Sequence, residues 1–158
     1  MNKPPAQSAV TLNTLMMPEH ANHLGNVHGG VLMKLVDEAA AICAIRHAQK
    51  PAVTVAMDSM TFKQPVQVGD LVTCAARVVY VHKSSMEIEV HVTAENLVSG
   101  TVTHTNSAFL VFVALGPDGR AAEVPGLVLE SDEDRRAFEA GQARQERRLA
   151  ARRDAKGP

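Results

Sequence analysis

The breaks between the apolar segments in the second half of the chain are short and rich in turn residues. They fall at residues 65–70, 82–85, 99–100 and 116–119, and they separate the segments 52–57, 71–81, 86–94 and 101–115. Residues 86–94 alternate between apolar and polar, which is the period of a half-buried strand, and the other segments are β-branched in character. Parallel neighbours would need crossovers of about a dozen residues or more. We therefore expect four strands whose successive members are antiparallel neighbours.

One long helix is expected before these strands, over residues 31–47. Its apolar positions follow helical spacing, and small or apolar residues continue around most of its circumference, as is typical of a buried helix. Arg46 and His47 suit its C-terminal end, where the helix dipole favours positive charge. Residues 10–17 are the expected first strand. This order predicts an α+β fold in which an antiparallel sheet wraps one long helix.

Composition excludes several classes of function. The chain has 158 residues, enough for one domain with a real core. A net charge of −1 and 3% aromatic residues provide neither a basic footprint nor a stacking platform, so we expect no nucleic-acid partner. Without an apolar run of about 18 residues or a signal-peptide core, we expect no membrane association. Two distant cysteines fit a reducing compartment, so the predicted location is cytoplasmic.

The segment GNVHGG at 25–30 leads straight into the long helix. Gly29 and Gly30 should leave unpaired amides at the first helical turn, where they attract an anion or a carbonyl oxygen that gains negative charge. Asp37 lies two turns into the helix on an apolar face, where an unpaired carboxylate would be costly, so a functional role is favoured. Glu38 is explained by an outer pair with Lys34.

Asn26 is the third candidate in this segment. An amide can both donate and accept, so it could hold a water molecule and a substrate oxygen together. The alternative is a turn residue that tolerates left-handed geometry, which is the better interpretation of an isolated asparagine. The acid that follows in the helix tilts the interpretation toward function.

These segments resemble the hotdog-fold acyl-CoA thioesterases of the cytosolic acyl-CoA hydrolase type. The resemblance rests on GNVHGGVLMKLVDEAAAI, VTVAMDSMTFKQPVQVGD and HKSSMEIEVHVTAENLVSG and covers about residues 10–125 in order. It implies a hotdog domain over residues 8–125, a long central helix wrapped by a curved antiparallel sheet. It also implies hydrolysis of acyl-CoA to a fatty acid and CoA without a cofactor.

The same resemblance assigns roles to residues. Asn26 and Asp37 would act on the thioester at a dimer interface, with the asparagine loop of one subunit facing the acid of the other. Our own hypothesis for the mechanism is that the Gly30 amide at the helix N-terminus, with Gly29, polarises the thioester carbonyl, while Asp37 serves either as general base or as nucleophile. The sequence leaves these two roles open. Homodimers would assemble further into a hexamer, a trimer of dimers.

Contacts with CoA are expected at two places. The turn HKSS at 82–85 offers Lys83, Ser84 and Ser85, and it resembles the segment that meets CoA in the family. Without the resemblance, an ordinary polar hairpin tip explains it equally well. His28 and Gly29 are the expected contacts beside the glycine loop, and Thr61 and Lys63 are weaker candidates.

Other chemistries are less well supported. His20, His23 and His28 with a helical acid lack metal-site spacing, so no metal is expected. Cys43 has no evident base partner and is expected to be inert core. An acyl-CoA hydratase would need His28 paired with Asp37, and a non-enzymatic acyl-CoA sensor would keep the pocket without hydrolysis. Both remain alternatives to the thioesterase.

Residues 126–158 form a charged tail, expected to be helical from an N-cap at Ser131. Its charges alternate in sign along a helical period, and apolar residues are few. This pattern predicts a solvated, partly frayed helix. Contact of the basic residues with an anionic ligand is the less favoured alternative.

Overall fold

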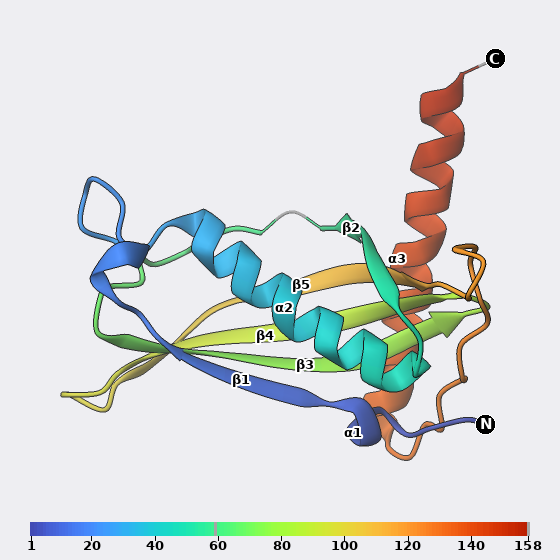
Figure 1. Ribbon diagram of the computed structural model, residues 1–158, viewed down its shortest axis with the longest axis horizontal. Coiled ribbons are helices and arrows are strands. Elements are labelled where there is room, and N and C mark those ends of the chain that lie inside the picture. The colour runs from blue at the N-terminus through green and yellow to red at the C-terminus, as the bar shows by residue number, and fades with distance from the viewer. Residues whose placement is uncertain (59, 158) are drawn as a thin grey trace.

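The computed structural model describes residues 1–58 and 60–157. The elements are α1 (Pro5–Ser8), β1 (Val10–Leu15), the 3-10 turn η1 (Pro18–His20), α2 (Gly29–Ala48), β2 (Ala52–Met57), β3 (Asp70–His82), β4 (Ser85–Asn96), β5 (Val102–Ala114) and α3 (Asp132–Lys156). Five strands form one antiparallel sheet in the order β1-β3-β4-β5-β2. The sheet curves around α2 (Figure 1), so the expected α+β hotdog architecture is confirmed.

The core lies between α2 and the concave face of the sheet. Val36, Ala39, Ala40, Cys43 and Ala44 of α2 are fully buried, and their small side chains let the helix approach the strands closely. The alternation predicted over 86–94 is confirmed, because its apolar members are buried and point toward α2. Among residues 1–58 and 60–157, no helix is long and apolar enough to cross a membrane.

The last turn of α2 was expected to carry positive charge at Arg46 and His47, and His47 departs from this expectation. Gln49 adopts a left-handed conformation with φ 53° and its amide bonds to the Ile45 carbonyl, so the helix ends before Pro51 as predicted. His47 is fully buried, and its Nε2 donates to the Pro125 carbonyl at 2.7 Å. Burial lowers the pKa of His47, so this residue is a neutral core donor and the dipole argument for it was wrong.

Strand β2 lies at one end of the sheet and leaves an open edge. It pairs with β5, and the register shifts between Thr54 and Ala56, where the edge bulges. Val53 and Val55 are 45% and 44% exposed. An open edge with apolar side chains is a ready surface for pairing with another strand.

The solvated tail helix expected from the charge pattern is wrong over the middle of α3. The Ser131 cap is confirmed, since its Oγ accepts from the Asp134 amide at 3.0 Å. Further along, Gly141 is buried against Tyr80, and the ring of Phe138 lies 4.9 Å from that of Tyr80. Helix α3 therefore covers the sheet face opposite α2, and its last turns project beyond the sheet (Figure 1).

Candidate active site at the open sheet edge

The candidate acid, Asp37, is held by a residue of the edge strand. The Thr54 hydroxyl donates to Asp37 Oδ1 at 2.8 Å, and the carboxylate is half-buried between α2 and β2. Thr54 lies directly opposite Phe112 of β5. Residues that lie opposite each other point to the same face of a sheet, and the Phe112 side chain is buried in the core against α2, so the Thr54 side chain also turns toward the helix. A hydrogen bond to one carboxylate oxygen fixes the orientation of the group and leaves Oδ2 for another partner.

Thr54 is a candidate site residue that sequence reasoning missed. Nothing in the run AVTVAM distinguishes its threonine from a β-branched strand former. The available signal was the short connection, residues 49–51, which forces β2 to start beside the end of α2 and run back along it.

The N-terminus of α2 presents two unpaired amides to an open space. Gly29 and Gly30 are the first helical residues, and amides at these positions have no partner within a helix. His28 precedes them, and its side chain forms no capping bond with the described residues. A Cβ on Gly29 would lie 3.2 Å from Phe62 Cε2, whereas a Cβ on Gly30 would meet no described atom within 4 Å. Gly29 is thus needed for packing, and Gly30 faces room for a ligand.

The loop before α2 contains two asparagines, Asn22 and Asn26, which are joined by hydrogen bonds to the backbone of Asn26. Asn22 Oδ1 accepts from the Leu24 amide at 2.9 Å and from the Asn26 amide at 3.2 Å, and the Asn22 amide donates to the Asn26 carbonyl at 2.6 Å. The acceptor of Asn22 is therefore fixed by the loop, which orients its NH₂ group. The side chain of Asn26 forms no hydrogen bond with residues 1–58 or 60–157. Asn22 is a further candidate, and its place in a turn signals it only weakly in the sequence.

The expected CoA-binding turn lies at the opposite end of the same protomer. Figure 1 shows the β3–β4 hairpin and the loop before α2 at the two ends of the sheet. Lys83 is exposed with φ 52°, and the Ser85 hydroxyl donates to the His82 carbonyl at 3.0 Å. One protomer thus places Thr54 against Asp37, with the glycine loop two turns earlier on the same helix, and places Lys83, Ser84 and Ser85 at the other end of the sheet.

Sequence comparison assigns the chain to a family. Residues 24–112 match the model of the Thioesterase superfamily, and this range includes the glycine loop, Asp37 and Thr54. The chain belongs to the thioesterase superfamily. The human cytosolic acyl coenzyme A thioester hydrolase is 37% identical over 139 residues, which is 87% of this chain, and the chain spans 37% of that relative's length. The acyl-CoA thioester hydrolase YciA of Salmonella typhimurium is 37% identical over 75% of this chain and 92% of its own.

Solved structures of the superfamily extend the likeness to the whole fold. The acyl-CoA hydrolase of Staphylococcus aureus, in complex with butyryl coenzyme A, coenzyme A and coenzyme A disulfide, is 33% identical with a TM-score of 0.90. The match covers 99% of this chain and 95% of that one. Three further structures of that enzyme carry alanine in place of an asparagine at its position 28, an aspartate at position 43 and a threonine at position 60.

The other candidate groups, which are the metal-ligating side chains, Cys43 and Glu38, have structural explanations. Within the described residues, no group of three or more histidine, cysteine or acidic side chains is arranged to hold a metal ion. Burial raises the pKa of the Cys43 thiol to about 12, which makes it a poor nucleophile. Lys34 and Glu38 form the expected ion pair at 3.7 Å, so Glu38 is an outer residue.

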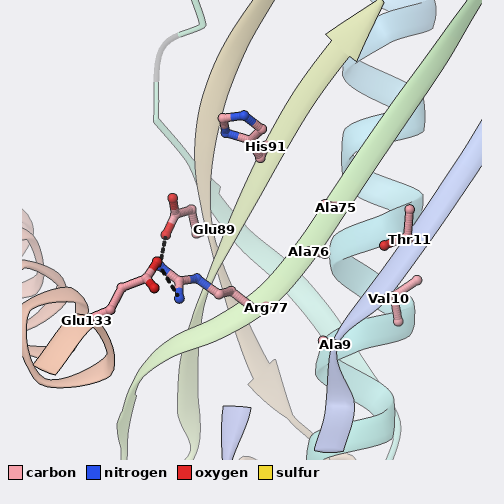
Figure 2. Close-up of a pocket in the computed structure, with 9 residues that line it drawn as sticks. All are labelled: Ala9, Val10, Thr11, Ala75, Ala76, Arg77, Glu89, His91 and Glu133. Atoms are coloured by element: carbon pink, nitrogen blue, oxygen red, sulfur yellow. Dashed lines mark hydrogen bonds and ion pairs between the residues drawn. The ribbon is translucent and has the colours of Figure 1, made fainter. Parts of the chain in front are cut away.

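A cavity of about 400 Å³ lies away from this site, on the other face of the sheet. Figure 2 shows its lining, which combines Ala9–Thr11 of the β1 edge, Ala75–Arg77 of β3, and Glu89, His91 and Glu133. Arg77 is paired with Glu89 at 3.2 Å and Glu133 at 3.4 Å, so its charge is already compensated. The candidate residues at the open edge do not line this cavity.

Proposed function

We propose that this protein hydrolyses acyl-CoA thioesters to a fatty acid and CoA. The observation that carries the proposal is the Asp37 carboxylate, held at 2.8 Å by Thr54 beside the open edge and two turns from the unpaired amides of Gly29 and Gly30. A base or nucleophile and an electrophilic cradle are the pair that acyl transfer requires. Because about 10 Å of helix separates them within one protomer, the acid of one subunit would act with the glycine loop of the other. The names of the relatives, and the CoA compounds bound to the S. aureus enzyme, support the substrate class.

The spacing of the residues replaced in the S. aureus enzyme supports three site positions. There the asparagine lies fifteen positions before the aspartate and the threonine seventeen after it. In this chain Asn22, Asp37 and Thr54 have the same two spacings. We therefore propose Asn22 beside Asp37 and Thr54, with Asn26, which the family resemblance favours, as the competing asparagine.

The proposed reaction uses the chain's own groups. The Gly30 amide, with Gly29, donates to the thioester carbonyl oxygen and stabilises the negative charge that develops there. Asp37 either takes a proton from the attacking water or attacks the carbonyl carbon itself. The carbon–sulfur bond then breaks, and CoA leaves as a thiolate that takes up a proton. When water attacks, the fatty acid is released in this step; when Asp37 attacks, the acyl group stays on Asp37 as an anhydride, which a water molecule hydrolyses to release the fatty acid and restore the carboxylate. The amide of Asn22 or Asn26 orients the water or the carbonyl.

A complete site is proposed to need a second copy of the chain. A two-fold axis across the open β2 edge would bring the β3–β4 hairpin of one protomer toward the glycine loop of the other. Lys83, Ser84 and Ser85 would then contact the CoA held beside His28 and Gly29. The exposed valines of β2 support pairing there. We propose a homodimer of this kind built on the domain over residues 8–125.

Further assembly into a hexamer, as a trimer of dimers, is also proposed. An apo-hexameric acyl-CoA thioesterase is 34% identical with a TM-score of 0.90, and a hexameric thioesterase of Yersinia pestis is 36% identical with a TM-score of 0.67. For location we propose the cytoplasm, because Cys43 and Cys74 are both free thiols and the human relative is named cytosolic.

The test is thiol release from acyl-CoAs of short to long chain, with the wild type and Asp37→Asn side by side. The variant keeps the shape of the side chain and loses the base, so turnover should fall by about 10²-fold or more. Asn22→Ala and Asn26→Ala, assayed together, separate the two asparagines, since the site residue should cost far more kcat. A wild type that binds acyl-CoA but releases no thiol above background would refute the enzyme and leave the sensor.

A further inference from the structure

In its described residues, the segment that follows β2 lies near both parts of the candidate site. Asp58 comes four residues after Thr54, and the ring of Phe62 packs against Gly29. The Asp58 amide donates to the Phe109 carbonyl at 3.0 Å, and Asn106 Nδ2 donates to the Thr61 carbonyl at 2.9 Å. Asp58 is thus fixed to β5 a short distance along the chain from the partner of the acid.

Arg148 of α3 reaches this segment from the opposite face of the sheet. Its Nη2 lies 3.1 Å from Asp58 Oδ2, and its Nε lies 3.3 Å from Asp58 Oδ1, so the guanidinium grips both carboxylate oxygens. The same Nη2 lies 2.7 Å from Oε2 of Glu87 on β4. An arginine that makes such a fork has one defined orientation, which a lysine cannot reproduce.

Asp58 is the second acid in a cluster of two arginines and two carboxylates. Glu87 is 2% exposed and would be costly without a partner, but Arg144 already donates to its Oε1 at 2.9 Å. The Asp58 side chain is 39% exposed and would be solvated if Arg148 were absent. The Asp58 carboxylate therefore balances the charge of Arg148, whose side chain is only 17% exposed, and in doing so it ties the end of β2 to α3.

We propose that Arg148 is a positioning residue for the thioesterase site. Helix α3 is itself fixed on the sheet by Gly141 and Phe138 against Tyr80. Through Asp58, Arg148 holds the end of β2 against the docked α3, which keeps Thr54 in line with Asp37. The inference rests on the proposed function, because its consequence is the alignment of the reacting groups.

The chain provides a matched control for this role. Both arginines bind Glu87, but of the two only Arg148 contacts Asp58 among the described residues. Arg148→Met and Arg144→Met each remove one partner of Glu87, and Arg144→Met also removes the guanidinium that lies 3.7 Å from the centroid of the Phe109 ring, so the control loses at least as much packing as the test variant. The positioning role predicts that Arg148→Met lowers kcat roughly tenfold or more, since a misplacement of about 1 Å can cost about 10²-fold. Arg144→Met should keep kcat within about twofold of the wild type.

The experiment measures kcat and KM with the best acyl-CoA substrate, alongside urea unfolding and oligomeric state. Asp58→Asn should reproduce the kcat loss of Arg148→Met without touching Glu87, and it serves as the milder variant if Arg148→Met does not fold. A variant that carries both Asp58→Asn and Arg148→Met should lose no more kcat than either single variant, because both substitutions remove the same contact. Arg148→Lys should recover kcat only in part.

Two results have distinct meanings. Suppose first that the wild type releases thiol. If Asp58→Asn and Arg148→Met then keep the kcat of the wild type, or if Arg144→Met loses as much kcat as Arg148→Met, the positioning role is refuted and the proposed function stands. If the wild type releases no thiol, the proposed function fails, and the inference falls with it.

Discussion

Replacing Gly141 by alanine tests the docking of α3 on the sheet, because two physical arguments predict opposite signs. Glycine inside a helix costs about 0.5–1 kcal/mol relative to alanine, so at a solvated position the substitution would stabilise the protein. In the structure, the added Cβ would lie 2.6 Å from Tyr80 Cβ and 3.2 Å from Glu87 Oε1. The first of these atoms belongs to a strand and cannot move away.

The close contact of the added Cβ with Tyr80 should cost more free energy than alanine gains through its higher helix propensity. Overpacking of this kind costs about 1–3 kcal/mol, and α3 must shift outward to relieve it. That shift also stretches the bond between Arg144 and Glu87, and a buried ion pair that is broken outright costs roughly 3–5 kcal/mol. We expect a net loss of about 1–3 kcal/mol after the propensity gain. For a chain of this size, each kcal/mol lowers Tm by about 2–4 °C.

The assay is urea unfolding of Gly141→Ala, with the midpoint and the m-value measured together. Ala140→Gly, at the exposed neighbouring position, is the control and should cost about 1 kcal/mol through propensity alone. A Gly141→Ala protein more stable than the wild type would refute the docking of α3 and restore the solvated helix expected from the sequence.

Three other predictions concern single side chains. Thr54→Val should lower kcat roughly tenfold or more, because a hydrogen bond to a charged group contributes about 1.5–3 kcal/mol; Thr54→Ser should retain most activity in the same thiol-release assay. Burial lowers the pKa of His47 below its unfolded value of about 6.5, so its contribution to the free energy of unfolding is complete above that pH and is lost as pH falls toward the lowered pKa. Urea unfolding between pH 5 and 8 should show this slope, and His47→Gln should flatten it. With its pKa raised to about 12, the Cys43 thiol should resist iodoacetamide at pH 8 and react only after unfolding, as mass spectrometry of its peptide would show; rapid labelling of the native protein would contradict its burial.

The local pattern of apolar residues was sufficient to predict the architecture of the fold. The alternation over 86–94 and the apolar spacing over 31–47 correspond to β4 and α2, since each depends on residues close in sequence. The helix begins at Gly29, two residues earlier than expected, because glycine is admitted at the first turn where a ligand or a ring approaches. Asp37 stood out for the same local reason, as a carboxylate on an apolar helix face.

Contacts between distant residues could not be read in this way. Thr54 meets Asp37 only because β2 lies beside α2, and the two residues are far apart along the chain. Arg144 and Arg148 were part of an alternating charge pattern, and their partner Glu87 lies on a strand 57 residues before Arg144. Gly141 was the missed local signal, because a glycine in the middle of a helix usually has a packing reason.

The proposed dimer across the open edge of β2 would make this protein sensitive to its own concentration. The strand that supplies the partner of the acid also exposes two valines and a row of backbone groups. If a second copy covers that edge, dilution should lower specific activity and at the same time release a protomer that adheres to other strands. The dissociation constant of the dimer would then set both the working range of the enzyme and the threshold at which it begins to aggregate.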